Sequence, residues 1–95
     1  WRAQWLPPGF YLASHQLPDA EGQESMMYTD GLAVFSVFID SVRGRVLPPI
    51  DATLGATVAV LTKADINGRE YAICVVGEIP RGTASQVASA ISLAP

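Results

Sequence analysis

The sequence predicts an α+β fold, a mainly antiparallel β-sheet with one C-terminal α-helix packed on one face. Three features predict it: an apolar extended run over residues 28–40, the dipeptide Asn67-Gly68 between two β-rich runs, and helical spacing of apolar residues after Pro80. The chain has 95 residues, of which 49% are hydrophobic and 16% charged. That length and composition suit a single globular domain with its own core.

The first elements are an extended lead-in and a strand. Pro7 and Pro8 fix the backbone and remove two hydrogen-bond donors, so residues 1–8 are predicted as a linker into a domain that spans residues 9–95. Aromatic and aliphatic residues over 10–17 predict a strand. Residues 18–25, which contain Gly22 and three acids, predict a solvated loop.

The run over residues 28–40 is apolar on both faces of an extended chain. Asp30-Gly31 suits either a turn between two strands or a bulge at Gly31 within one strand, and we favour two strands. Alternation places Leu32, Val34 and Phe38 on one side and Ala33, Phe35, Val37 and Ile39 on the other. A sheet with one wet face would alternate apolar with polar residues, so this one needs cover on both sides.

Residues 43–54 predict a long loop, because Gly44, Pro48, Pro49 and Asp51 interrupt any regular element. A hairpin follows, formed by residues 55–66 and 69–78 around Asn67-Gly68, both of which tolerate positive φ in a type I′ turn. A two-residue turn fixes the register. The expected pairs on one side are Ala64 with Tyr71, Thr62 with Ile73, Val60 with Val75 and Val58 with Gly77; on the other they are Leu61 with Cys74 and Ala59 with Val76. Both sides are apolar near the middle, and Asp65 opposite Glu70 marks an exposed tip.

Pro80 is well placed for a first helical turn, and a helix of about 12 residues is expected from Thr83 onward. Its apolar face would consist of Ala84, Val87, Ala88 and Ile91. One short helix covers only one face of a sheet. The second apolar face therefore needs a curled sheet, a neighbouring domain or a partner.

Composition excludes several functions. The net charge is −3, and the basic residues are scattered apart from Arg43 and Arg45, so nucleic-acid binding is not expected. No apolar run reaches the roughly 18 to 20 residues that span a bilayer, and no signal peptide is visible. The chain opens at Trp1 without an initiator Met, so we expect a processed or excised piece of something longer.

No catalytic, cofactor or metal motif is present. His15 with Asp19 and Glu21 matches no metal-ligand spacing, which favours a surface or hydrogen-bonded strand histidine. Cys74 lies in a strand pattern and is expected to act as a small buried hydrophobe. The carboxylates Asp30, Asp40 and Glu78 near strand ends give no sign of a shared pocket. We therefore expect no enzyme, no cofactor and no metal.

The candidate partner-binding residues are Trp1, Trp5, Tyr11, Leu61 and Val76. Trp1 and Trp5 lie outside the regular pattern, and aromatic residues are enriched both in cores and at interfaces. Docking on another domain and packing on this one both stay open for them. Leu61 and Val76 belong to the surplus apolar side of the hairpin.

The amino-acid sequences of three segments, in this order along the chain, resemble those of a known family. They are WLPPGF at residues 5–10, MYTDGLAVFSVFI at residues 27–39, and VVGEIP at residues 75–80 with Thr83-Ala84 just after. Together they resemble the C-terminal domain of the MucB/RseB family, over nearly the whole chain. The resemblance implies the smaller domain of a bacterial periplasmic regulator, preceded in the family by a larger N-terminal domain similar to lipoprotein carriers.

The same resemblance implies the partners. Members of the family bind the periplasmic part of a membrane-spanning anti-sigma factor, MucA or RseA, and shield it from proteolysis. The envelope-stress sigma factor, which is linked to alginate regulation, then stays silent until lipid-type signals release it. The alternatives are a lipid-binding module and a purely structural interdomain-packing domain. Strand order and homo-oligomer formation stay open.

Overall fold

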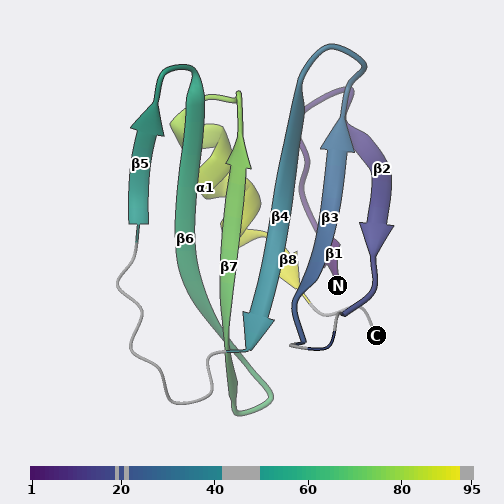
Figure 1. Ribbon diagram of the computed structural model, residues 1–95, viewed down its shortest axis with the longest axis vertical. Helices are drawn as coiled ribbons and strands as arrows, with labels where there is room; N and C mark the ends of the chain where they lie inside the picture. Colours follow the sequence, from purple (N-terminus) through teal and green to yellow (C-terminus); the bar gives the residue numbers. More distant parts are fainter. Residues whose placement is uncertain (19, 21, 42–49, 93–95) are drawn as a thin grey trace.

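The computed structural model describes residues 1–18, 20, 22–41 and 50–92. Its main body is a six-stranded antiparallel sheet in the order β2-β3-β4-β7-β6-β5, with one helix, α1, behind β6 and β7 (Figure 1). The elements of this body are β2 Tyr11–Gln16, β3 Glu24–Thr29, β4 Val34–Ser41, β5 Ile50–Leu54, β6 Thr57–Ile66, β7 Arg69–Gly77 and α1 Arg81–Ser89. The short strands β1 Arg2–Ala3 and β8 Ile91–Ser92 pair in a separate two-stranded sheet. The predicted α+β class is confirmed.

The β6–β7 hairpin has the predicted turn and register. Asn67 and Gly68 adopt φ values of 55° and 81°, the left-handed conformations that a type I′ turn requires. Val60 lies opposite Val75 and Leu61 opposite Cys74, as the two-residue turn dictates. The central strand β7 also pairs with β4, so this hairpin aligns the rest of the sheet.

Residues 28–40 form parts of two strands, which confirms the alternative we favoured over a single bulged strand. The connection spans residues 30–33 and is longer than a two-residue turn. The Asp30 carboxylate accepts hydrogen bonds from the backbone N–H groups of Leu32 at 2.9 Å and Ala33 at 2.8 Å. These bonds lower the pKa of Asp30 and close the loop as an Asx turn.

The prediction of a loop over residues 43–54 was wrong at its C-terminal end. Ile50–Leu54 forms strand β5, which pairs with β6 through a turn at Gly55 with φ 60°. An edge strand needs only one partner, so Asp51 opposite Val60 does not prevent pairing. The predicted breakers Gly44, Pro48 and Pro49 lie outside the described residues.

The helix is shorter than predicted. It has 9 residues and ends at Ser89, whereas we expected about 12. Ala84, Val87 and Ala88 are buried against the sheet as the spacing indicated. Ile91 is also buried, but it belongs to β8 and reaches the core from there.

The core lies between α1 and the inner face of the sheet, which is the face turned toward the helix. Phe35, Val37, Ile73 and Val75 are at most 1% exposed there. Over β3 and β4 the cover is the N-terminal segment of residues 1–10, which passes behind these strands together with β8 (Figure 1). Phe10 packs on Phe35 with 5.3 Å between ring centroids. Residues 1–8 therefore pack on the same body as the sheet.

Candidate partner-binding surface

The outer face of the sheet is the face turned away from α1 and toward the viewer in Figure 1. Cross-strand register places two rows of side chains on it, because residues opposite each other share a face. The rows are Met27, Ser36, Val76, Ala59 and Ala52, and Gln16, Ser25, Phe38, Cys74 and Leu61. Neither row contains a charged residue, so the middle of this face is apolar with small polar side chains among its members.

Exposure differs sharply between the two faces. On the inner face Val60, Ile73 and Val75 are buried, whereas Leu61, Cys74 and Val76 on the outer face are only half-buried. Larger apolar side chains on the outer face are more open still: Met27 is 41%, Val34 44% and Leu54 86% exposed. The helix covers one face, as predicted, and within the described part of the chain the other face has no cover.

Charged side chains lie at one end of the outer face, near the β6–β7 turn. Asp40 and Lys63 flank Ala72 in the next row, and Asp65 faces Glu70 at the tip of the β6–β7 hairpin. An apolar surface bordered by charged side chains is expected of an interface that loses water at its middle and stays hydrated where it meets the charges.

The structure separates the predicted partner-binding residues into two groups. Leu61, Val76 and Tyr11, which is 57% exposed on β2, lie on the outer face. Trp1 and Trp5 are half-buried and pack against the core, with the Trp1 ring 4.8 Å from that of Tyr71 in an edge-to-face contact. The two tryptophans thus pack on this domain. A role for any of the five in binding stays a prediction.

Sequence reasoning missed Met27, Val34 and Leu54 as surface residues. The alternation of the apolar run already placed Val34 on the side opposite Phe35, but nothing in the sequence said which side the helix would cover. Leu54 fell in the predicted loop. The pairing of β5 with β6, which places Leu54 on the outer face, is a tertiary feature.

A hollow of about 210 Å³ opens on the outer face beside the edge strand β2. It exists because small side chains stand between two large apolar ones, Met27 and Phe38. The lining residues are Ser14, Gln16, Ser25, Met26, Met27, Ser36 and Phe38. Its size matches one large side chain rather than a cofactor.

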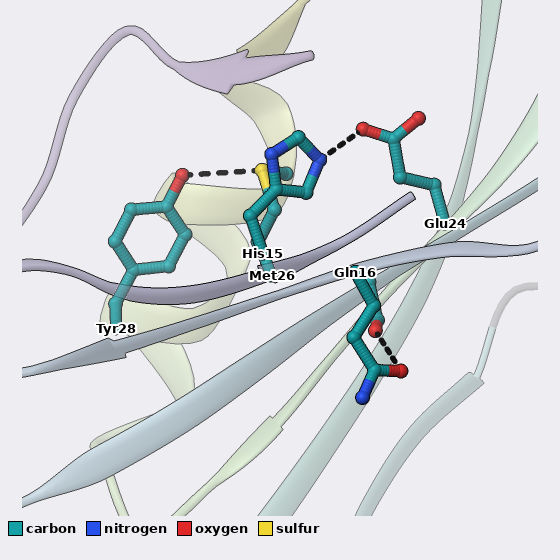
Figure 2. A network of polar contacts seen from close by, with 6 residues as sticks. His15, Gln16, Glu24, Met26 and Tyr28 are labelled. Atoms are coloured by element: carbon teal, nitrogen blue, oxygen red, sulfur yellow. Dashed lines mark hydrogen bonds and ion pairs between the residues drawn. The ribbon is translucent and has the colours of Figure 1, made fainter. Parts of the chain in front are cut away.

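The inner side of the same edge carries a polar contact between neighbouring strands. Figure 2 shows His15 joined to Glu24 on one side of the strands and Gln16 on the other. His15 is thus a hydrogen-bonded strand histidine, as favoured. Its other imagined metal partners, Asp19 and Glu21, lie outside the described residues, and among the described residues no group of three or more His, Cys, Asp or Glu side chains is placed to hold a metal ion.

The Cys74 thiol and the Tyr28 hydroxyl both have raised pKa values, so neither ionises readily. Burial raises the pKa of the Cys74 thiol, so it stays protonated and behaves as a small apolar side chain. Burial also raises the pKa of Tyr28, against a smaller opposing effect of a hydrogen bond with the Ala3 backbone. The Tyr28 hydroxyl donates to the Met26 sulfur at 3.5 Å within the core (Figure 2).

A larger hollow, of about 750 Å³, lies at the end of the sheet near the β6–β7 turn. Trp1 and Tyr71 form an aromatic wall, and charged side chains of both signs, Glu24, Glu70 and Arg69, line the rest with several small residues. Its mixed polar lining differs from the apolar outer face.

Within the described residues no helix is long and apolar enough to cross a membrane.

Comparison with known proteins identifies the family. The model of the MucB/RseB C-terminal domain matches residues 1–92. The regulatory protein MucB of sigma factor AlgU from Pseudomonas aeruginosa is 40% identical over 96% of this chain. The sigma-E factor regulatory protein RseB from Haemophilus influenzae is 33% identical over 92% of it. The chain spans 30% and 27% of the lengths of these two relatives.

Solved structures of MucB have the same fold as this chain. The Pseudomonas aeruginosa MucA/MucB complex has a TM-score of 0.80 and 37% identity, and the match covers 92% of this chain and 32% of that one. A crystal structure of MucB with MucA(peri) gives the same score and identity over 34% of its chain. MucB alone gives a TM-score of 0.75 at 34% identity, covering 94% of this chain and 31% of that chain. With the fold, the ordered segments and the family match in agreement, this chain belongs to the MucB/RseB C-terminal domain family.

Proposed function

We propose that this domain acts in the periplasm as part of a negative regulator of the envelope-stress sigma factor. It binds the periplasmic part of a MucA/RseA-like anti-sigma factor and protects it from proteolysis, and it catalyses no reaction. The observation that carries the proposal is the uncovered apolar outer face, on a chain whose solved neighbours at TM-score 0.80 include MucB bound to MucA.

The physical basis is burial of apolar surface. Each Å² of apolar surface removed from water contributes about 25 cal/mol. A partner segment that covers Met27, Val34, Leu61 and Val76 would bury the middle of the face, and the charged end near the β6–β7 turn would stay solvated. Shielding from a protease follows because a bound segment cannot enter a protease active site in extended form.

Residues 1–8 lead into the domain from a larger N-terminal domain similar to lipoprotein carriers, and residues 9–95 form the small domain. In this arrangement the entry segment packs against the small domain, through the contact of Trp1 with Tyr71 and the pairing of β1 with β8. The position of one domain relative to the other would then depend on contacts made by residues 1–8.

The test is calorimetric titration of the protein with the anti-sigma periplasmic domain. Leu61→Lys places a charge in the middle of the outer face and should weaken binding about tenfold or more, since desolvating an unpaired charge costs at least about 1.4 kcal/mol. The control Gln86→Lys carries the same new charge on the exposed side of α1 and should bind like the parent. Absence of heat with the parent protein at high micromolar concentration would refute the proposal.

A second candidate is direct binding of a lipid signal, favoured by the same open apolar face. A solvatochromic lipid probe would then bind this domain without the larger one, and Leu61→Lys would abolish its blue shift. A purely structural role is less well supported, because Met27, Val34 and Leu54 leave apolar surface in water.

A further inference from the structure

Among the described residues no strand pairs with the outer edge of β2. β2 is the last strand in the order on its side, and all six of its side chains, from Tyr11 to Gln16, are exposed. It contains neither Lys nor Pro, residues that commonly protect an edge from further pairing. Its one irregularity is a register shift between Leu12 and Ser14. The edge is therefore available to another strand on both sides of this shift.

The ladder shows which backbone groups face outward. The Asp30 N–H donates to the Ala33 carbonyl at 3.3 Å across the β3–β4 connection. Bonding direction alternates along an antiparallel pair, so Thr29 directs its backbone groups toward β2 and bonds with Tyr11. Leu12, the next residue, then directs its N–H away from β3. This donor points into the space that an added strand would occupy.

The hollow of about 210 Å³ adjoins this edge on the outer face. An added strand alternates its side chains between the two faces, so every second one lies over the outer face beside Ser14. Ser14 and Ser36 are small, and a long apolar side chain passing over Ser14 reaches the space between Met27 and Phe38. Backbone pairing supplies affinity in such an arrangement, and the hollow supplies selectivity.

We propose that an extended, apolar segment of the anti-sigma factor's periplasmic domain adds to β2 as a further strand and places one large apolar side chain in this hollow. The occupant is a polypeptide because the edge presents backbone donors and acceptors that only another backbone satisfies in series. The inference rests on the proposed function and specifies the surface that performs it. It also joins the edge to the apolar rows of the outer face, since Met27 lines the hollow and belongs to the first row.

Filling the hollow tests the side-chain site. Ser36→Phe places a ring where the partner's side chain would sit and should weaken binding of the anti-sigma periplasmic domain by about tenfold or more, which corresponds to about 1.4 kcal/mol. Gln86→Phe is the matched control, because it adds the same ring at an exposed position on α1, which lies on the other side of the sheet from the hollow. It should leave the affinity unchanged. Circular dichroism of both variants establishes that the sheet is intact.

Removing the outward donor tests the edge. Leu12→Pro deletes this one N–H, which proline tolerates on an edge strand whose donor faces solvent. It should weaken binding by about threefold to tenfold, the equivalent of one net hydrogen bond. Leu12→Ala is the reference for this comparison, since it also removes the leucine side chain but keeps the N–H. Leu12→Pro should bind more weakly than Leu12→Ala by that factor.

The outcomes separate this inference from the proposed function. If the parent protein does not bind the anti-sigma domain, the proposed function fails. If the parent binds and both Ser36→Phe and Leu12→Pro bind equally well, the function stands and the β2 site is wrong. Sedimentation equilibrium could instead show that the parent is a dimer and that Leu12→Pro is a monomer with unchanged anti-sigma binding. That result would mean that β2 pairs with a second copy of this chain, and it would overturn the proposal. Loss of lipid-probe binding in Ser36→Phe alone would do the same in favour of a lipid.

Discussion

Gly77 is the position where a single methyl group would meet the backbone of a neighbouring strand. A Cβ built there would lie 2.5 Å from the Phe35 Cβ and 2.7 Å from both the Phe35 Cα and the Val34 carbonyl oxygen. Phe35 is 1% exposed at the centre of the core and contacts both Phe10 and Tyr28. The absence of a side chain at Gly77 therefore allows β4 and β7 to pair closely at Phe35.

Gly77→Ala should destabilise the domain by about 1–3 kcal/mol, because relieving the clash requires shifting β4 or β7. Urea unfolding measures this. Gly82→Ala is the control, since nothing lies within 4 Å of a Cβ at that position and alanine favours a helix over glycine. The control should keep or raise stability. Equal midpoints for the two variants would show that β4 and β7 are not packed as closely as described.

At the scale of elements, the features that depend on nearby residues, the β6–β7 hairpin and the helix, could be predicted from the sequence. The Asn67-Gly68 turn fixed both strands of the β6–β7 hairpin and every cross-strand pair, because the positive φ of each residue and the pairing register depend only on the chain nearby. The helix was also predicted, since Ala84, Val87 and Ala88 share one face.

The rest depended on tertiary contacts. Helical spacing continues to Ile91, but that residue pairs with Ala3 of β1, a partner 88 positions away along the chain, so the helix ends before it. We missed β5 because the glycine and prolines just before it predicted a loop. Its pairing with β6 at the edge of the sheet depends on tertiary contacts that the local sequence does not show. Of the site, Leu61 and Val76 followed from alternation, whereas the hollow beside β2 arises from the alignment of three strands and has no signature in any one of them.

The helix owes its stability to packing rather than to its own sequence. It has 9 residues, no side-chain cap at its N-terminus, no acidic residue in its first turn and no basic residue in its last. A helix this short is marginal in water. Its buried residues, and Val87 above all, therefore hold it on β6 and β7.

Val87→Asp should destabilise the domain by about 3 kcal/mol or more, because it buries an unpaired charge at a position that is 0% exposed. The far-ultraviolet circular dichroism of the helix and the thermal midpoint both report it. Gln86→Asp, on the exposed side of the same turn, should change stability by less than about 0.5 kcal/mol. An unchanged thermal midpoint for Val87→Asp would refute the placement of α1.

At the scale of the whole molecule, two segments share the cover of one face of the sheet, and the described residues leave the other face open. The helix seals β6 and β7, and the N-terminal segment with β8 seals β3 and β4, all on the inner side (Figure 1). Both covering segments thus lie on the same side of the sheet. Within the described residues the apolar rows of the outer face have no such cover, and a partner chain is the proposed one.

The most direct test of this account is methyl NMR of the protein with a soluble paramagnetic probe, before and after addition of the anti-sigma periplasmic domain. The methyl groups of Met27, Val34 and Leu61 should broaden strongly in the free protein and be protected in the complex. The methyl groups of Val75 and Val87, which are 0% exposed, should be protected in both states. Outer-face methyl groups already protected in the free protein, or unaffected by the partner, would contradict the claim that this face is open and receives it.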